Sequence, residues 1–87
     1  MKTIYKYKLN EVDTQIVKMP NDAQILSVGE QDGELMLWAR VDTSNEKEAR
    51  KIEIYGTGAR ELDEHELSFI GTVQMSDGLV WHIFENR

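Results

Sequence analysis

The residues best suited to bind a ligand are aromatic and basic side chains on segments that alternate like strands. Trp38 and Arg40 share one face of such a segment, and Trp81 and His82 are neighbours near the end of the chain. Aromatic rings and a guanidinium group can stack on a base and hold its phosphate, and Trp and Arg are also prominent in protein interfaces. Core packing is the competing explanation for both tryptophans, so packing, ligand binding and partner binding all stay open.

A short glycine-rich segment follows Tyr55. Glycines let backbone N–H groups approach an anion, so Gly56, Thr57 and Gly58 form a candidate phosphate-binding nest. The segment lacks the spacing of a dinucleotide-binding fingerprint or a P-loop, and a tight turn at a strand end is the alternative. The candidate ligand- or partner-binding residues are therefore Trp38, Arg40, Tyr55, Gly56, Thr57, Gly58, Trp81 and His82.

Acidic residues crowd the segment from 61 to 66. They are Glu61, Asp63, Glu64 and Glu66. The 87 residues carry a net charge of −6, with +2 in residues 1–20 and −8 in residues 21–87. A general nucleic-acid binder would need the opposite sign, so no direct nucleic-acid binding is expected. The cluster is either a solvated loop or an acidic partner-binding surface that docks on a basic protein.

Catalytic chemistry has little support in this sequence. Cysteine is absent, no G-x-S-x-G elbow occurs, and no pair of carboxylates is singled out by its spacing. His65 lies among acids, but metal-binding histidines converge with several further ligands, and the only other histidine, His82, is distant. We therefore predict no enzyme activity, no cofactor and no metal site.

Alternation of apolar and polar residues predicts strands along nearly the whole chain. Asp32-Gly33 and Ser76-Asp77-Gly78 predict hairpin turns, and Met19-Pro20-Asn21-Asp22 predicts another turn. Residues 43–48 are expected to be a loop and residues 59–66 at most one helical turn. Strands are expected at residues 4–9, 14–19, 23–28, 34–41, 50–55, 68–75 and 79–84, with 23–28 paired to 34–41, 68–75 paired to 79–84, and 79–84 in a central position.

The fold class predicted is mainly β, as an antiparallel sandwich or a partly open small barrel of about seven short strands. Scaling of surface with mass gives roughly 64% of the extended surface buried on folding, enough for one modest core. Residues 1–87 are therefore expected to form a single globular domain. No apolar run is long enough for a membrane span, and we expect a cytoplasmic protein. A homodimer is expected because it would cover exposed strand edges.

Several segments that together cover nearly the whole chain match a known pattern, namely residues 2–7, 16–20, 23–28, 37–42, 56–58, 69–73 and 80–85. Through these segments the sequence resembles a family of small, uncharacterised proteins encoded by bacteriophages and prophages. Relatives tend to have Asp-Pro where this chain has Asp42-Thr43-Ser44, so we expect a looser loop there. The resemblance implies no activity and no functional residue, but it supplies a context of phage and host.

In that context we predict a non-catalytic phage or prophage protein acting against host defence in the bacterial cytoplasm. One mechanism is inhibition of a host defence protein or nuclease complex through an acidic and aromatic surface. The other is sequestration of a nucleotide second messenger by the glycines, Arg40 and the aromatic rings. The alternative is a phage structural, assembly or accessory protein with no defence role.

Overall fold

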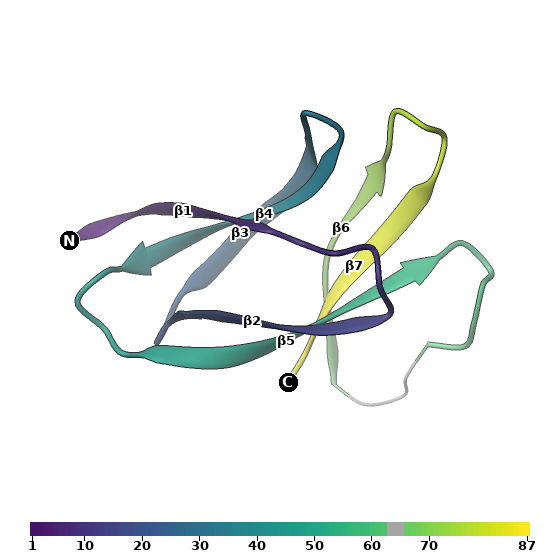
Figure 1. Ribbon diagram of the computed structural model, residues 1–87. Coiled ribbons are helices and arrows are strands. Elements are labelled where there is room, and N and C mark those ends of the chain that lie inside the picture. Colours follow the sequence, from purple (N-terminus) through teal and green to yellow (C-terminus); the bar gives the residue numbers. More distant parts are fainter. Residues whose placement is uncertain (63–65) are drawn as a thin grey trace.

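The computed structural model contains seven β-strands, and the structure describes residues 1–62 and 66–87 (Figure 1). The predicted acids Asp63 and Glu64, together with His65, lie outside the described residues. The strands are β1 (Lys2–Lys8), β2 (Thr14–Pro20), β3 (Gln24–Gln31), β4 (Glu34–Asp42), β5 (Lys47–Gly56), β6 (Leu67–Gln74) and β7 (Val80–Asn86).

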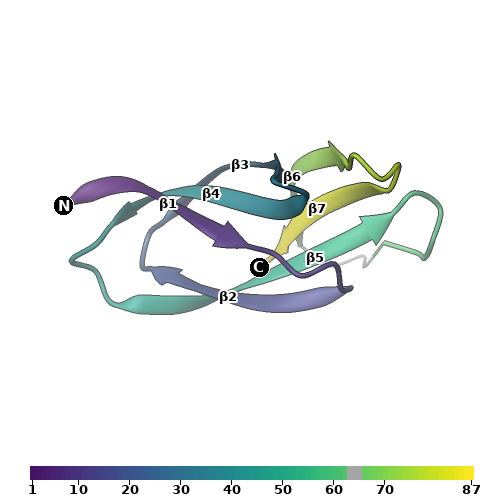
Figure 2. The same cartoon turned by 45° about the horizontal axis from the view of Figure 1, so that its top comes forward.

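These strands form two antiparallel sheets, with the orders β1-β4-β3 and β2-β5-β7-β6. Figure 2 shows the three-stranded sheet lying over β2 and β5, with β6 and β7 beside β3 and β4. The predicted antiparallel sandwich is therefore confirmed. Within the described residues there is neither a helix nor a closed barrel, so the helical turn allowed for 59–66 is not formed by residues 59–62 or 66.

Local turn chemistry sets both predicted hairpins. Asp32 and Gly33 have φ values of 54° and 79° between β3 and β4, as the favoured two-residue hairpin turn requires. Gly78 has a φ of 94° between β6 and β7, and its N–H donates to the Met75 carbonyl at 3.0 Å. The predicted pairings β3 with β4 and β6 with β7 are confirmed, and β7 has the predicted central place in its sheet.

The β4–β5 connection is shorter than the polar sequence of residues 43–48 predicts. Strand β5 begins at Lys47 because its first residue pairs with Pro20 at the end of β2. Asn21 donates its N–H to the Glu46 carbonyl at 2.7 Å, and the Asn45 amide donates to the Asn21 carbonyl at 3.0 Å. Strand pairing thus overrides the loop-like composition of residues 47 and 48.

The core lies between the two sheets and comes from the inward positions of alternating strands. Leu35, Leu37, Ala39 and Val41 of β4 all point inward, as predicted. The apolar residues of the other sheet meet them from the opposite side. The largest fully buried side chains are Leu9, Met19, Leu35, Leu37, Ile52 and Ile83.

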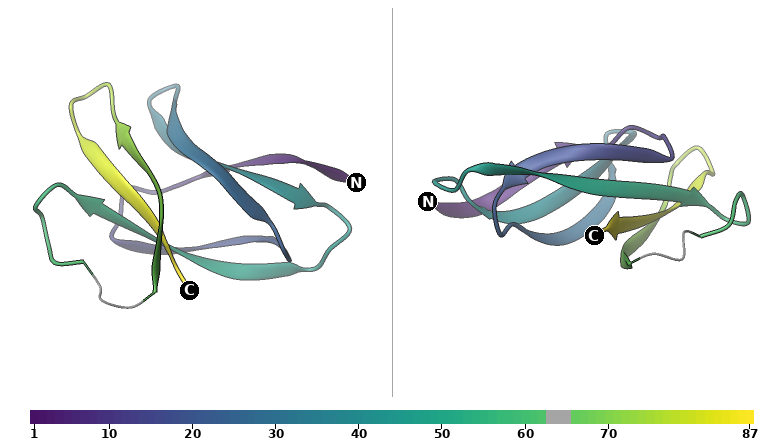
Figure 3. Two further views of the ribbon diagram at one scale, coloured as in Figure 1. Left: turned by 180° about the vertical axis from the view of Figure 1, so that it is seen from behind. Right: turned by 90° about the horizontal axis from the view of Figure 1, so that it is seen from below.

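The two sheets meet along β3 and β6, which lie side by side without joining into one sheet (Figure 3). The strands approach closely where Gly71 faces Val28, because a Cβ atom at Gly71 would lie only 3.0 Å from Val28 Cγ2. Just beyond, Glu30 Oε2 accepts hydrogen bonds from Ser76 N–H at 3.0 Å and from Ser76 Oγ at 2.8 Å. At the other end the strands diverge and leave a hollow of about 470 Å³.

The close approach predicts that Gly71→Ala destabilises the protein. The added methyl group overlaps Val28 and forces β3 and β6 apart, which costs about 1–3 kcal/mol in the free energy of unfolding. Adding Val28→Ala removes the atom that clashes, so the double variant loses less stability than the sum of the single losses. Urea unfolding of the three variants measures this coupling, and strictly additive losses would contradict the steric explanation.

A buried ion pair joins the inner faces of β5 and β7. Arg50 Nε and Nη2 donate to the two carboxylate oxygens of Glu85, the second at 2.9 Å, and Nη1 donates to the Ala23 carbonyl at 2.9 Å. The Arg50 and Glu85 side chains are only 16% and 8% exposed. The hydrogen bonding of Arg50 to the Glu85 carboxylate is the main cause that raises the pKa of Arg50 above its usual value. One guanidinium group therefore links β5, β7 and Ala23, the residue just before β3.

Breaking this pair from one side should be costly. Arg50→Met leaves the Glu85 carboxylate buried without its partner, and we expect a loss of about 3 kcal/mol in the free energy of unfolding. Arg50→Met combined with Glu85→Met recovers much of that loss because no charge stays buried. Chemical denaturation measures both, with the exposed neighbour Lys51→Met as the control, expected within about 0.5 kcal/mol of wild type. A single variant as stable as the control would refute the assignment.

Candidate functional site

An aromatic cluster lies on the outer face of the four-stranded sheet. The strand register places Phe84 of β7 opposite Phe69 of β6, and the ring centroids of these residues are 5.3 Å apart. Tyr55 of β5 meets Phe84 edge-to-face at 5.5 Å. Rings from three neighbouring strands therefore form one cluster, at separations that favour aromatic pairs, with Tyr55 buried and Phe69 exposed.

Arg60 covers the Tyr55 ring of this aromatic cluster. Its guanidinium carbon lies 3.7 Å from the centre of the Tyr55 ring, which is a cation–π contact. Arg60 Nη2 also donates to the carbonyl oxygens of Ile54 at 3.0 Å and of Asp13 at 3.3 Å, and the Asp13 carboxylate is 3.7 Å from Nε. This cation is therefore occupied by partners within the chain.

Gly58 directs the chain back over the sheet. Its φ of 69° is in the region that favours glycine, and the Ala59 N–H closes the turn onto the Gly56 carbonyl at 3.2 Å. At Gly56 an added Cβ would be in tight contact with the Ala59 Cβ at 3.3 Å and in ordinary contact with the Trp81 ring at 3.5 Å. The segment has the tight-turn geometry that was the alternative to a phosphate nest.

His82 is held between two threonine hydroxyl groups. Thr57 Oγ1 lies 2.8 Å from Nε2 and Thr72 Oγ1 lies 2.9 Å from Nδ1. Since one hydroxyl can donate and the other accept, a neutral imidazole satisfies both contacts. A ligand that bonds to His82 must displace one of these hydroxyl groups, so the ring is a positioned part of the wall.

A buried carboxylate lies beneath the aromatic rings. Glu53 is 4% exposed and accepts hydrogen bonds from the Tyr55 hydroxyl at 3.1 Å and from the Asn86 amide. These bonds compensate for its burial and orient the Tyr55 ring. Glu53 therefore supports the floor of the site and is closed off from solvent.

Together these groups enclose a hollow of about 300 Å³, which we call the aromatic hollow. Five of the eight predicted binding residues line it, namely Tyr55, Gly56, Thr57, Gly58 and His82. Sequence reasoning missed the other four, which are Arg60, Leu62, Phe69 and Phe84. The paired alternation of β6 and β7 could have indicated Phe69 and Phe84, but nothing local points to Arg60 or Leu62.

The other three predicted residues lie elsewhere. Trp38 and Arg40 are on β4 in the three-stranded sheet, so they cannot act together with the Gly56–Gly58 turn. Trp81 packs against the core, and its indole N–H donates to Glu11 Oε1 at 2.7 Å. The predicted set is therefore divided among two outer faces and the interior.

In the acidic segment, Glu61 lies in the chain between Arg60 and Leu62, which both line the aromatic hollow. Glu61 and Glu66 are exposed on either side of residues 63–65. No group of three or more potential metal ligands occurs among residues 1–62 and 66–87. In the same part of the chain, no helix is long and apolar enough to cross a membrane.

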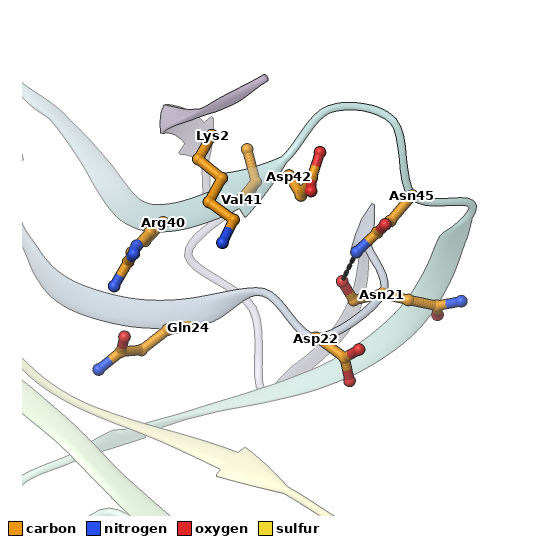
Figure 4. A pocket seen from close by; sticks show the side chains of 8 residues that line it. All are labelled: Lys2, Asn21, Asp22, Gln24, Arg40, Val41, Asp42 and Asn45. Carbon is orange, nitrogen blue, oxygen red and sulfur yellow. Dashed lines mark hydrogen bonds between the residues drawn. The ribbon is translucent and has the colours of Figure 1, made fainter.

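A second hollow, of about 340 Å³, lies on the three-stranded sheet where β4 ends and β1 and β3 begin (Figure 4). Lys2, Gln24 and Arg40 line one part of it, and Asp42 lies beside the loop that follows β4. Ser44 donates to Asp42 Oδ1 from its hydroxyl at 2.6 Å and from its N–H at 3.1 Å. The loop expected to be looser is thus braced by hydrogen bonds at its start.

These bonds from Ser44 lower the pKa of Asp42 from its usual 3.8 to about 2, with a smaller contribution from the N-terminal amine. Because the pKa of Asp42 is lower in the folded protein than in the unfolded chain, the ionised form stabilises the fold above pH 3.8, and this contribution is lost as the pH falls toward 2.

The hydrogen bonds from Ser44 lead to a prediction: Ser44→Ala should raise the Asp42 pKa toward 3.8, because the hydroxyl donor is removed. A carboxyl-detected NMR titration measures it, with Thr43→Ala as the control, and a wild-type midpoint near 3.8 would disprove the assignment.

A protein-family model matches residues 1–87 of this chain. The chain belongs to the family described as Domain of unknown function (DUF7352). Comparison with curated proteins and with solved structures found no match to this chain. The resemblance to an uncharacterised family is thus confirmed at the level of the family, and the DUF7352 description assigns no activity.

Proposed function

We propose that this DUF7352 protein is a non-catalytic binding protein that attaches to a partner protein through the aromatic hollow. The observation that carries the proposal is apolar exposure at the mouth of the hollow. Phe69 is 61% exposed and Leu62 is 55% exposed, beside the half-buried ring of Phe84. A partner side chain placed between Phe69 and Leu62 would cover apolar surface that water now contacts.

The charge around the hollow favours a basic partner. Glu61 is exposed between the lining residues Arg60 and Leu62 in the chain, and Glu66 is exposed one residue before β6, the strand of Phe69. Arg60 is already engaged by Asp13 and the Tyr55 ring. An apolar centre with a charged rim is the usual arrangement of a protein interface. The resemblance to phage and prophage proteins adds the context, so the partner we propose is a host defence protein or nuclease complex with a basic groove.

Nucleotide sequestration is less well supported at this hollow. A phosphate needs a cation or several free N–H groups, and the one cation in the described lining, Arg60, already has partners. The residues proposed for the phosphate and for the base are also divided between the two sheets. A protein partner therefore fits the lining better than a nucleotide does.

The test uses affinity capture from bacterial lysate followed by binding measurements with the purified captured protein. Phe69→Ala with Leu62→Ala should weaken binding at least tenfold if these residues anchor the interface. Ile16→Ala is the matched control, since Ile16 is 57% exposed on β2 and lies outside the hollow. The control variant should bind like wild type.

Charge reversal tests the acidic rim separately. Glu61→Lys with Glu66→Lys should slow association and reduce its dependence on salt, whereas Glu46→Lys, an exposed acid on another loop, should have little effect. Binding that is indifferent to the aromatic and acidic variants alike would refute the proposal. Co-purification with virions without binding to any host protein would favour the assembly role.

The homodimer also stands as a proposal. Strands β1 and β2 each end a sheet, so each has one edge without a neighbouring strand in the described chain. Pairing of such edges between two copies would satisfy their backbone groups. Sedimentation at several protein concentrations distinguishes a dimer from a monomer.

A further inference from the structure

A group of basic side chains gathers on the outer face of the three-stranded sheet, opposite to the aromatic hollow. The register aligns Ile4, Arg40 and Gln24 in one row across β1, β4 and β3, and Lys6 opposite Trp38 in the next. Alternation places Lys2 on the same face as Ile4. This face is therefore basic although the chain as a whole carries −6.

None of these three cations forms an ion pair among the described residues, but Lys6 Nζ donates to Gln31 Oε1 at 2.8 Å, which leaves Lys2 and Arg40 as the two without a bonded side-chain partner there. Within residues 1–62 and 66–87, the acids that form ion pairs do so with the N-terminal amine, Lys8, Arg50 and Arg60, and neither Lys2 nor Arg40 takes part. Figure 4 shows their nitrogen-bearing ends directed the same way, toward Gln24, while the carboxylate of Asp22 is directed away from them. The other carboxylate nearby, Asp42, is bonded to Ser44.

Lys2 and Arg40 are shared by two adjoining hollows of different character. The first is the polar hollow of about 340 Å³ that also contains Gln24 and Asn45. The second, of about 310 Å³, is bounded by Ile4 and Leu26, which are 59% and 45% exposed. An anionic group between the two cations would thus have amide groups on one side and an apolar surface on the other.

We propose that this double hollow, which we call the Lys2–Arg40 site, binds a small phosphomonoester that carries a flat or apolar group. A phosphate with two negative charges matches the two unpaired cations, whereas a carboxylate would leave one of them uncompensated. The attached group would lie over Ile4 and Leu26, the apolar residues that border the second hollow.

The Lys2–Arg40 site is independent of the proposed protein interface, since the two lie on different sheets. Loss of one would leave the other unaffected. A nucleoside monophosphate and an alkyl phosphate share the required chemistry, and they differ in whether the apolar part is a flat ring or a chain. Inorganic phosphate and a nucleoside each supply one half of the ligand.

Amide chemical shifts measured by NMR test the proposal, with adenosine monophosphate, hexyl phosphate, adenosine and inorganic phosphate as probes. We expect adenosine monophosphate or hexyl phosphate to shift the amides of residues 2–4, 24–26 and 40–42 at millimolar concentration, and to do so more strongly than phosphate or adenosine alone. The tighter of the two phosphomonoesters then assigns the class of ligand.

Substitution separates this site from general attraction of anions. Arg40→Gln and Lys2→Gln should each weaken binding about tenfold, because each removes a charge-assisted bond to the phosphate. Both side chains are exposed, so the fold should persist, and Lys18→Gln on β2 is the control with an equal change in charge.

Three results would overturn the proposal. The first is the absence of shifts with both phosphomonoesters, and the second is equal binding of inorganic phosphate and the phosphomonoesters. The third is a set of shifts that Arg40→Gln leaves unchanged or that centre on Thr57, Phe69 and His82, which would place nucleotide binding in the aromatic hollow.

Discussion

Arg50, held by its buried pair with Glu85, connects the two sheets, which strand pairing alone does not join. The pair reinforces the pairing of β5 with β7, and the third bond of Arg50 reaches the carbonyl of Ala23, the residue just before β3 of the other sheet. At the far end the same two sheets are held by the Gly71–Val28 approach. A polar contact and a steric contact therefore fix how the sheets face one another, and the hydrophobic core fills the space between them.

This arrangement gives the two outer faces different chemistry. The face of the four-stranded sheet carries aromatic rings, exposed Phe69 and Leu62, and acids beside them, which suits a basic protein partner. The face of the three-stranded sheet carries Lys2 and Arg40, which form no ion pair within residues 1–62 and 66–87 and suit a small anion. The net charge of −6 is a sum over both faces, so it describes neither surface.

Much of the fold was predictable because its signals are local. Asp32-Gly33 and Gly78 adopt positive φ values that few other residues tolerate, so the two hairpins follow from neighbouring residues. The start of β5 was missed because its first residues are polar and become a strand only through pairing with β2. The site was half predictable: Tyr55 to Gly58 are consecutive, whereas Phe69 and Phe84 join them through a sheet order that periodicity does not encode.

The sequence by itself determined the class of the protein: seven strands with hairpins, a core of alternating apolar residues, and an acidic chain without cysteine. Those properties depend on backbone preferences and side-chain types that act over a few residues. Only the tertiary structure decided which candidate residues meet. Trp38 and Arg40 lie on a different sheet from Tyr55, and Trp81 packs against the core. Alternation along a strand shows which residues share a face. Whether that face is buried or exposed depends on the neighbouring strands and on the opposite sheet.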